Sequence, residues 1–211
     1  MIFHLIIFAL LNFIIYLNID FLINKFNVYD LPDSNRKQHQ NQISVFGGGI
    51  ILLNLIFLLC IVIFNENKYP EFLSNNRNFF SIFIIPLLIY VIGLFDDKLL
   101  IKNNAKFLSL FCLIFLVLII DKEIVLEKIT FSWIDREILL LNFSIVFTGL
   151  CILAFMNSFN FLDGIDLLCG IYSLIIFIIF FNLTKSFFFI PFIFALILFC
   201  LLNYKKKLFL G

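Results

Sequence analysis

The sequence has little charge for its length and few of the side chains that mark soluble proteins. Asp, Glu, Lys and Arg make up only 14% of its 211 residues, against about 25% in an average soluble domain. The formal net charge is +1, and there are only two histidines. This balance offers no basic surface for a nucleic acid, so we expect no nucleic-acid partner.

Cysteine pairs, internal repeats and low-complexity linkers are also absent. None of the five cysteines forms a C-x-x-C pair, so the sequence says little about the redox compartment. Apolar residues dominate instead: 63% of the residues are hydrophobic, 32 of them phenylalanine, and the mean hydropathy is +1.12. This composition excludes an intrinsically disordered chain and indicates an integral membrane protein.

Seven apolar runs are candidates for membrane spans, each of which needs about 20 helical residues. They lie near residues 1–19, 45–64, 79–95, 107–120, 141–155, 167–181 and 187–202. No Lys or Arg precedes Lys25, so the first run is expected to stay as a span and not to be cleaved as a signal peptide. Seven spans would use roughly 140 residues, which predicts one integral-membrane domain over residues 1–211 without a separate soluble domain.

The positive charges predict the orientation of these spans. If the spans alternate, one side of the membrane carries nine Lys and Arg residues and the other carries six. The positive-inside rule makes the first side cytoplasmic. It holds residues 22–44, 96–106, 156–166 and 203–211.

A period-two pattern lies on the opposite side. Ile129, Phe131 and Trp133 alternate with Thr130 and Ser132, which predicts a short strand or hairpin near the lipid surface. The predicted fold is therefore an all-α polytopic membrane protein with about seven transmembrane helices and a small extracytoplasmic strand or hairpin element.

The first polar motif is DLPDSNRKQHQNQISVFGGG, at residues 30–49. Arg36, Lys37 and His39 can donate hydrogen bonds to phosphate oxygens, and the three glycines allow a helix or a ligand to approach the backbone closely. The loop therefore suits an anionic substrate. The alternative is a topology anchor followed by a tight helix-packing site.

The second motif is VIGLFDDK, at residues 91–98, in which Asp96 and Asp97 end an apolar run. A carboxylate inside the bilayer costs about 2.5 to 3.5 kcal/mol, so the pair should lie at the interface or in a polar cavity. Adjacent helical residues lie about 100° apart, so one acid could bind a hard cation while the other accepts a proton. The alternative is a pair of solvated acids at a helix end.

The third motif is MNSFNFLDGID, at residues 156–166, between two apolar runs. Asn157, Asn160, Asp163 and Asp166 recur every three residues, so neighbouring members can meet on a helix although all four cannot converge. We expect Asp163-Gly164 to end the helix and to turn the carboxylate toward a site. The alternative is an ordinary polar turn.

All three motifs fall on one predicted side of the membrane. Together they supply cation ligands, phosphate donors and amide groups. This combination indicates metal-assisted phosphoryl transfer, in which the protein mainly positions the reactants while a divalent ion offsets the developing charge.

At these motifs the sequence resembles the polyprenyl-phosphate N-acetylhexosamine-1-phosphate transferases. This superfamily includes undecaprenyl-phosphate GlcNAc-1-phosphate transferases and phospho-N-acetylmuramoyl-pentapeptide transferases. The matching pieces are DLPDSNRKQH with GGG, GLFDD followed by Lys106-Phe107, and NSFNFLDGID, in the family's order. The resemblance implies transfer of a sugar 1-phosphate from a UDP-sugar to polyprenyl phosphate, with release of UMP and with Mg²⁺ or Mn²⁺ as cofactor.

The resemblance also implies roles for individual residues. Asp96, Asp97 and Asp163 would be catalytic, with Asp96 and Asp97 as metal ligands and Asp97 more directly involved with the lipid phosphate. Whether a carboxylate acts as nucleophile or as base stays open. The residues expected to bind substrate are Arg36, Lys37, His39, Asn157, Asn160 and Asp166.

The chain departs from the family's pattern at several points. Ser44 stands where the family usually has proline, and Leu167 stands where many members have glycine. The terminal KLFLG, which ends at Gly211, is similar to the opening of the family's F-x-G-D-x-G-S motif, and the later histidine-rich loop is absent. The resemblance implies that a further metal-binding aspartate of the family would lie beyond Gly211. We therefore expect a chain that is incomplete at its C-terminus and is not a competent catalyst as it stands.

The resemblance implies a place and partners for the protein. The expected location is the bacterial inner membrane with the active site facing the cytoplasm, and the partners are UDP-sugar, polyprenyl phosphate and the bilayer, with a homodimer left open. The R-K-x-H form of the first loop is more similar to the N-acetylglucosamine or related hexosamine branch of envelope polysaccharide synthesis than to the peptidoglycan branch. The alternatives are a non-catalytic membrane protein that binds nucleotide sugar or polyprenyl phosphate, and a small ion-coupled transporter.

Overall fold

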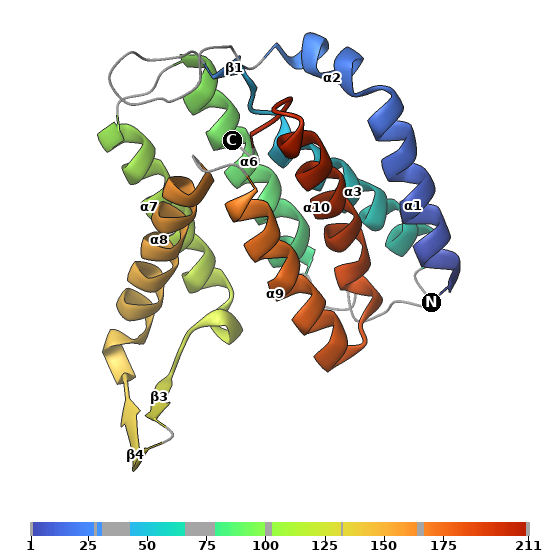
Figure 1. Ribbon diagram of the computed structural model, residues 1–211. Helices are drawn as coiled ribbons and strands as arrows, with labels where there is room; N and C mark the ends of the chain where they lie inside the picture. Colours follow the sequence, from blue (N-terminus) through green and yellow to red (C-terminus); the bar gives the residue numbers. More distant parts are fainter. Residues whose placement is uncertain are drawn as a thin grey trace.

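A computed structural model describes most of the chain: residues 2–27, 29–30, 43–65, 79–99, 103–131, 133–163 and 167–209. The protein is mostly helical (82%). The helices lie side by side, and a β-hairpin projects from one end of them (Figure 1). The main helices are α1 (Ile2–Leu17), α2 (Ile19–Phe26), α3 (Gly47–Phe64), α6 (Ile85–Leu99), α7 (Asn103–Ile120), α8 (Ser144–Asp163), α9 (Leu168–Thr184) and α10 (Ile190–Tyr204).

Shorter elements connect these helices. A π-helical segment, η2 (Phe80–Ile84), leads directly into α6. The 3₁₀ turns are η3 (Lys122–Ile124), η4 (Leu141–Phe143) and η5 (Phe187–Phe189). The strands are β1 (Tyr29–Asp30), β2 (Ile43–Ser44), β3 (Lys128–Phe131) and β4 (Ile134–Leu139), paired antiparallel as β1 with β2 and β3 with β4.

Each of the seven apolar runs contains a helix, but seven full spans are not confirmed. Among the described residues, three helical segments are long and apolar enough to cross a membrane, or up to four if the bent pair α1 and α2 counts as one span. The three are Gly47–Phe64, Leu141–Leu162 and Phe187–Tyr204. The apolar helices at Phe80–Asp96, Ala105–Ile120 and Leu168–Thr184 are shorter than the roughly 20 residues of a full span.

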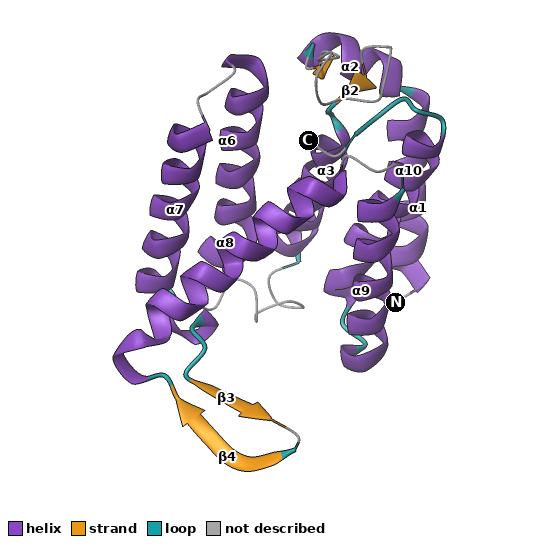
Figure 2. Cartoon of the chain, turned by 60° about the vertical axis from the view of Figure 1, so that its left-hand side comes forward, coloured by secondary structure: helices purple, strands orange, loops and turns teal. Residues whose placement is uncertain are grey.

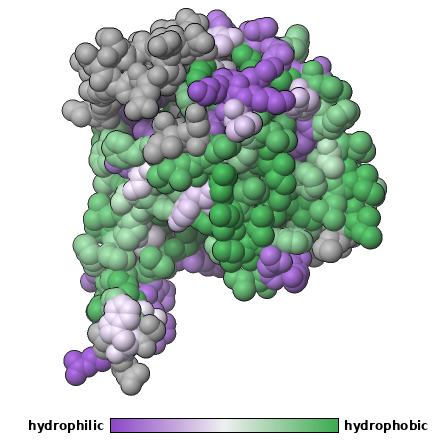
Figure 3. Space-filling model, viewed as in Figure 1, coloured by the Kyte–Doolittle hydropathy of each residue, from purple (hydrophilic) through white to green (hydrophobic). Residues whose placement is uncertain are grey.

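The surface supports insertion of these helices in lipid. Large apolar side chains are exposed along most of the helices, including Phe3, Phe64 and Leu183. The face shown in Figure 3 is mostly hydrophobic over the helices, and hydrophilic residues gather toward the ends. An apolar surface of this extent would be unfavourable in water, so we treat the helices as membrane-embedded.

Helix α10 packs against α1 and α3 in an apolar core. Its residues Ala195, Phe199 and Leu202 are buried against Ile15 of α1 and Ile50 of α3. On its other flank α10 meets α9 at a glycine. A Cβ atom at Gly170 would lie 2.7 Å from Cys200 Sγ, so the close approach of α9 and α10 depends on the small residue there.

A buried pair of asparagines joins α1 to α3. Asn12 Nδ2 donates to Asn54 Oδ1 at 2.8 Å, and Asn54 Nδ2 donates to Asn12 Oδ1 at 3.1 Å. Each amide also donates to a carbonyl four residues earlier, at Phe8 and Ile50 respectively. These bonds satisfy both amides inside an apolar core, where an unpaired amide would be costly.

The end of α7 near the hairpin is fixed to η2 by a polar contact. Ser81 Oγ donates to Asp121 Oδ2 at 2.5 Å, and Asp121 is buried. The other carboxylate oxygen of Asp121 accepts from the backbone N–H of Glu123, which caps η3. Asp121 therefore ties together η2, α7 and η3 at this end of the molecule.

The hairpin of β3 and β4 lies where the alternating pattern predicts a strand. Lys128 pairs with Leu139, and Thr130 with Glu137. Trp133, in the turn, is 77% exposed. Figure 2 shows the hairpin extending away from the helices, at the end opposite α2 and β2. The extracytoplasmic location of the hairpin stays a prediction.

Candidate active site at one end of the helices

The segments that flank the three polar motifs meet at one end of the molecule. The C-terminal ends of α6, α8 and α10 and the N-terminal ends of α7 and α9 point to the end that also carries α2, β1 and β2 (Figures 1 and 2). The hairpin lies at the opposite end. The fold therefore brings the predicted motif segments to a common end, as alternation of the apolar runs requires.

The predicted site residues are described to different extents. Asp96, Asn157 and Asn160 are described with their side chains, whereas Asp97 and Asp163 are placed only as positions in α6 and α8. Helix α8 is described as far as Asp163, and the helix end expected at the Asp163-Gly164 step borders on residues 164–166, which lie outside the described ranges. The predicted residues that lie outside the described ranges are Arg36, Lys37, His39 and Asp166.

Asp96 forms an ion pair with Lys106 across the two antiparallel helices α6 and α7. Lys106 Nζ contacts Asp96 Oδ2, and the two side chains are 33% and 16% exposed, Lys106 being the more exposed. The ammonium group offsets the cost of holding a carboxylate out of water, and it fixes the direction of Asp96. Sequence reasoning noted Lys106 only as part of a motif and not as a site residue, although its opposite charge just across a short connection was the available signal.

Asn157 and Asn160 lie on the last turns of α8, toward the same end of the molecule as the acidic pair. Both residues are exposed. They are three positions apart, so their directions on the helix differ by about 60°. Two neighbouring amides that are accessible and can both donate and accept are suited to hydrogen-bond a nucleobase or a sugar.

The C-terminal segment pairs with the strand that precedes the glycines. Leu208 forms a parallel bridge with Ser44. The N–H of Phe209 donates to the carbonyl of Ser44 at 2.8 Å, and the N–H of Gly47 donates to the carbonyl of Phe209 at 2.9 Å. Residues 208–209 therefore extend the small β1 and β2 sheet and cover the start of α3.

Leu167 has an unusual backbone conformation directly before α9. Its φ is 65°, in the left-handed region that glycine adopts without strain and leucine does not. This geometry gives a physical reason why a glycine would be favoured here, as in many members of the family that the sequence resembles. The N–H of Leu167 donates to Asn203 Oδ1 at 2.6 Å.

Of the two predicted metal ligands, the structure describes the side chain of Asp96 alone. No group of three or more His, Cys, Asp or Glu side chains in the described ranges could hold a metal ion. Asp96 offers hard carboxylate oxygen, which is the ligand type that Mg²⁺ prefers, and Lys106 contacts one of its two oxygens. The carboxylate of Asp96 therefore fits a divalent cation by its chemistry, and the metal itself stays a prediction.

The expectation about the end of the chain is not tested by the structure. The described residues end at Phe209, so Gly211 lies outside them. The further metal-binding aspartate that the resemblance places beyond Gly211 therefore stays a prediction, and so does the expectation that the chain is incomplete.

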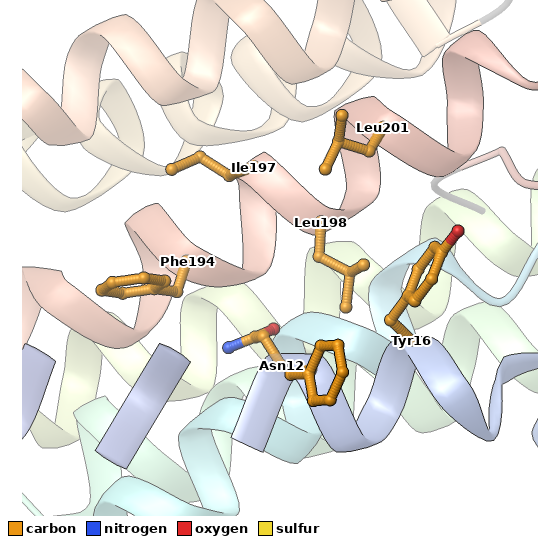
Figure 4. Close-up of a pocket in the computed structure, with 7 residues that line it drawn as sticks. Asn12, Tyr16, Phe194, Ile197, Leu198 and Leu201 are labelled. Atoms are coloured by element: carbon orange, nitrogen blue, oxygen red, sulfur yellow. The ribbon is translucent and has the colours of Figure 1, made fainter. Parts of the chain in front are cut away.

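A groove lies between α1 and α10, apart from the acidic residues. It has a volume of about 310 Å³ and is lined by Asn12, Phe13, Tyr16, Phe194, Ile197, Leu198 and Leu201. Figure 4 shows these side chains converging from the two helices. The lining is almost wholly apolar and carries no carboxylate, so the groove is not the place for phosphoryl transfer.

Comparison with known families decides which class of protein has this arrangement. Residues 79–211, which include Asp96, Lys106 and the 156–166 motif, match glycosyl transferase family 4. The chain belongs to this family. It is the family of the polyprenyl-phosphate GlcNAc-1-phosphate and phospho-MurNAc-pentapeptide transferases, which confirms the resemblance seen in the sequence.

Membership in glycosyl transferase family 4 indicates a sugar-phosphate transferase activity in general. It also suggests nucleotide-sugar and lipid-phosphate substrates and a membrane location. The match begins after the first polar loop, so residues 30–49 lie outside it. No curated protein matches the chain significantly.

Proposed function

We propose that this protein transfers an N-acetylhexosamine 1-phosphate from a UDP-sugar to polyprenyl phosphate. An oxygen of the lipid phosphate attacks the phosphorus that carries the sugar, the bond from that phosphorus to the UMP oxygen breaks, and UMP leaves. The product is a lipid-linked sugar diphosphate, the starting point for an envelope polysaccharide or a cell-wall precursor. The observation that carries the proposal is the ion-paired Asp96 beside Asp97 at the end of α6, within the family match.

The residues of the three motifs have separate roles in this reaction. Asp97 acts on the lipid phosphate, and Asp96, held by Lys106, supports it. Asp163 completes the catalytic group at the end of α8. Six residues bind the nucleotide sugar and its phosphates: Arg36, Lys37, His39, Asn157, Asn160 and Asp166.

A divalent cation, Mg²⁺ or Mn²⁺, belongs to the proposal. Asp96 and Asp97 would hold it, and it would offset the negative charge on the two phosphates that react. Both substrates are anions, so their reaction needs positive charge that offsets the charge of the phosphates. The ammonium group of Lys106 is one positive charge in this region, and it is paired with Asp96.

The direct test is metal-dependent release of UMP. The full-length gene product, in lipid nanodiscs that contain undecaprenyl phosphate, is mixed with radiolabelled UDP-N-acetylglucosamine and Mg²⁺. We expect UMP and labelled lipid in equal amounts, and loss of both when EDTA is added. The matched control is Glu137→Gln, because Glu137 is an acid on the hairpin that pairs with Lys128 far from the site.

The two alternatives predict different results in the same preparation. A non-catalytic binding protein would retain UDP-sugar or polyprenyl phosphate without releasing UMP. A transporter would accumulate solute in proteoliposomes only under an ion gradient. Either result, with no UMP formed, would contradict the transferase.

The proposal places the site on the cytoplasmic side of a bacterial inner membrane. With the native cysteines replaced, a cysteine introduced at Trp133 in the hairpin turn should react with an impermeant maleimide in whole cells. A cysteine at Lys102, which lies outside the described residues, should react only after permeabilisation. Labelling of both positions from one side would contradict the orientation.

A further inference from the structure

Asn203 is a buried amide near the end of α10, and its two polar atoms bind two different segments. It is only 3% exposed. Its Oδ1 accepts from the N–H of Leu167 at 2.6 Å, and its Nδ2 donates to the carbonyl of Leu208 at 2.7 Å. One side chain thus connects the start of α9 with the C-terminal segment.

The first of these bonds holds a strained residue. Leu167 has a left-handed backbone that leucine adopts only when its surroundings impose it. The carbonyl of Leu167 accepts from the N–H of Ile171 in α9, and its N–H donates to Asn203. Both backbone polar groups of Leu167 are therefore held by hydrogen bonds. Because Leu167 directly follows the 156–166 motif, Asn203 determines where that motif joins α9.

The second bond, to the Leu208 carbonyl, holds a segment that pairs with the first motif. Leu208 is paired with Ser44, and the next residue, Phe209, forms backbone hydrogen bonds with Ser44 and Gly47. Ser44 is the last residue of β2 and Gly47 is the first residue of α3, and both belong to the first motif. A shift of Leu208 would therefore move the base of the first motif.

We propose that Asn203 is a positioning residue that fixes the 156–166 motif relative to the first motif, a role that rests on the proposed function. A nucleotide sugar has a base, a sugar and a diphosphate in one molecule, so it must meet the amides of one motif and the cations of the other at the same time. A brace between the two motifs sets the distance that this substrate has to bridge. Asn203 acts on the substrate through Leu167 and Leu208 and not by contact.

The chain offers a matched control for a role that is only structural. Asn54 is also a buried asparagine with its Oδ1 and Nδ2 both hydrogen-bonded, but its partner Asn12 and the Ile50 carbonyl lie within the helices. Removal of either amide should lower stability. Only removal of Asn203 should change how the two motifs are held.

Hydrogen exchange tests the brace without turnover. Asn203→Ala removes both the acceptor for the Leu167 N–H and the donor to the Leu208 carbonyl. We expect exchange about fivefold faster in peptides that contain Leu167 and in peptides that contain Phe209 and Gly47. Asn54→Ala should change exchange in neither region. Equal exchange in parent and Asn203→Ala would overturn the proposal.

Steady-state kinetics tests the consequence for the substrate. Asn203→Ala should lower kcat/KM for UDP-N-acetylglucosamine by about tenfold to a hundredfold, mostly through KM. The KM for polyprenyl phosphate should change less than about twofold. A fall in both substrates' kcat/KM that Asn54→Ala reproduces at a similar Tm would show a stability effect and overturn the positioning role. A parent protein that releases no UMP would contradict the proposed function, and the exchange experiment would still decide the brace.

Discussion

Asp97→Asn is expected to reduce release of UMP from UDP-sugar by about a thousandfold or more, because the amide can neither accept a proton nor serve well as a ligand of a divalent cation. Asp97 follows Asp96 in α6, and adjacent helical positions differ by about 100° in direction. Since Asp96 is already bound to Lys106, Asp97 has the more direct role in our proposal. The measurement is the initial rate of UMP release at equal amounts of membrane-inserted protein.

Variants of the ion pair provide the comparison for Asp97. Asp96→Asn and Lys106→Met should each lower the rate by about tenfold to a hundredfold, because they displace the acid that supports the site. The double variant should be no slower than the slower of the two single variants, since both changes break one interaction. Turnover near the parent rate in Asp97→Asn would remove Asp97 from the mechanism.

Asn54→Leu should lower the free energy of unfolding by about 1 to 3 kcal/mol, which is a large effect on stability for one residue. The change removes both hydrogen bonds between Asn12 and Asn54 and leaves the side-chain oxygen of Asn12 without that partner in an apolar core. The measurement is reversible unfolding in mixed micelles, with transferase activity as the check that the site is intact.

The double variant Asn12→Leu/Asn54→Leu distinguishes the contribution of the hydrogen bonds from the contribution of side-chain packing. With both amides gone, neither side chain leaves a polar atom unpaired, so the double variant should be more stable than either single variant. The coupling energy from the four proteins then measures the pair itself. Strictly additive losses would show that the two amides do not depend on each other.

The sequence predicted the helices better than their contacts. The apolar runs correspond to helices because a continuous apolar run is a local property of the sequence, and Asp96 lies near a helix end because it ends such a run. The contacts between Asn12 and Asn54 and between Leu167 and Asn203 join residues far apart in the chain. Nothing in the local pattern of an asparagine within an apolar run distinguishes a brace from an ordinary helical residue.

The residues of the candidate site stay predictions, and the contacts around them were not predicted. The acidic pair and the amides are predicted from the motifs, because these residue types are unusual beside apolar spans. Lys106 and Asn203 are not among the predicted site residues: the contact of Lys106 joins α6 to α7, and the contacts of Asn203 join α10 to the last described residues of the chain. The sequence showed that Leu167 replaces a glycine common in the family, but it did not show the left-handed backbone conformation of this residue.

The π-helical segment η2 determines how α6 can turn about its own axis. Ser81 reaches Asp121 at one end of α7, and Asp96 reaches Lys106 at the other. Over the ~15 positions between Ser81 and Asp96, a pure α-helix would leave the two side chains about 60° apart. The wider π turn reduces this angle, so both contacts face α7 together. Rotation of α6 in either direction would break both contacts, so the contact at Ser81 helps to fix the orientation of the acidic end of the helix.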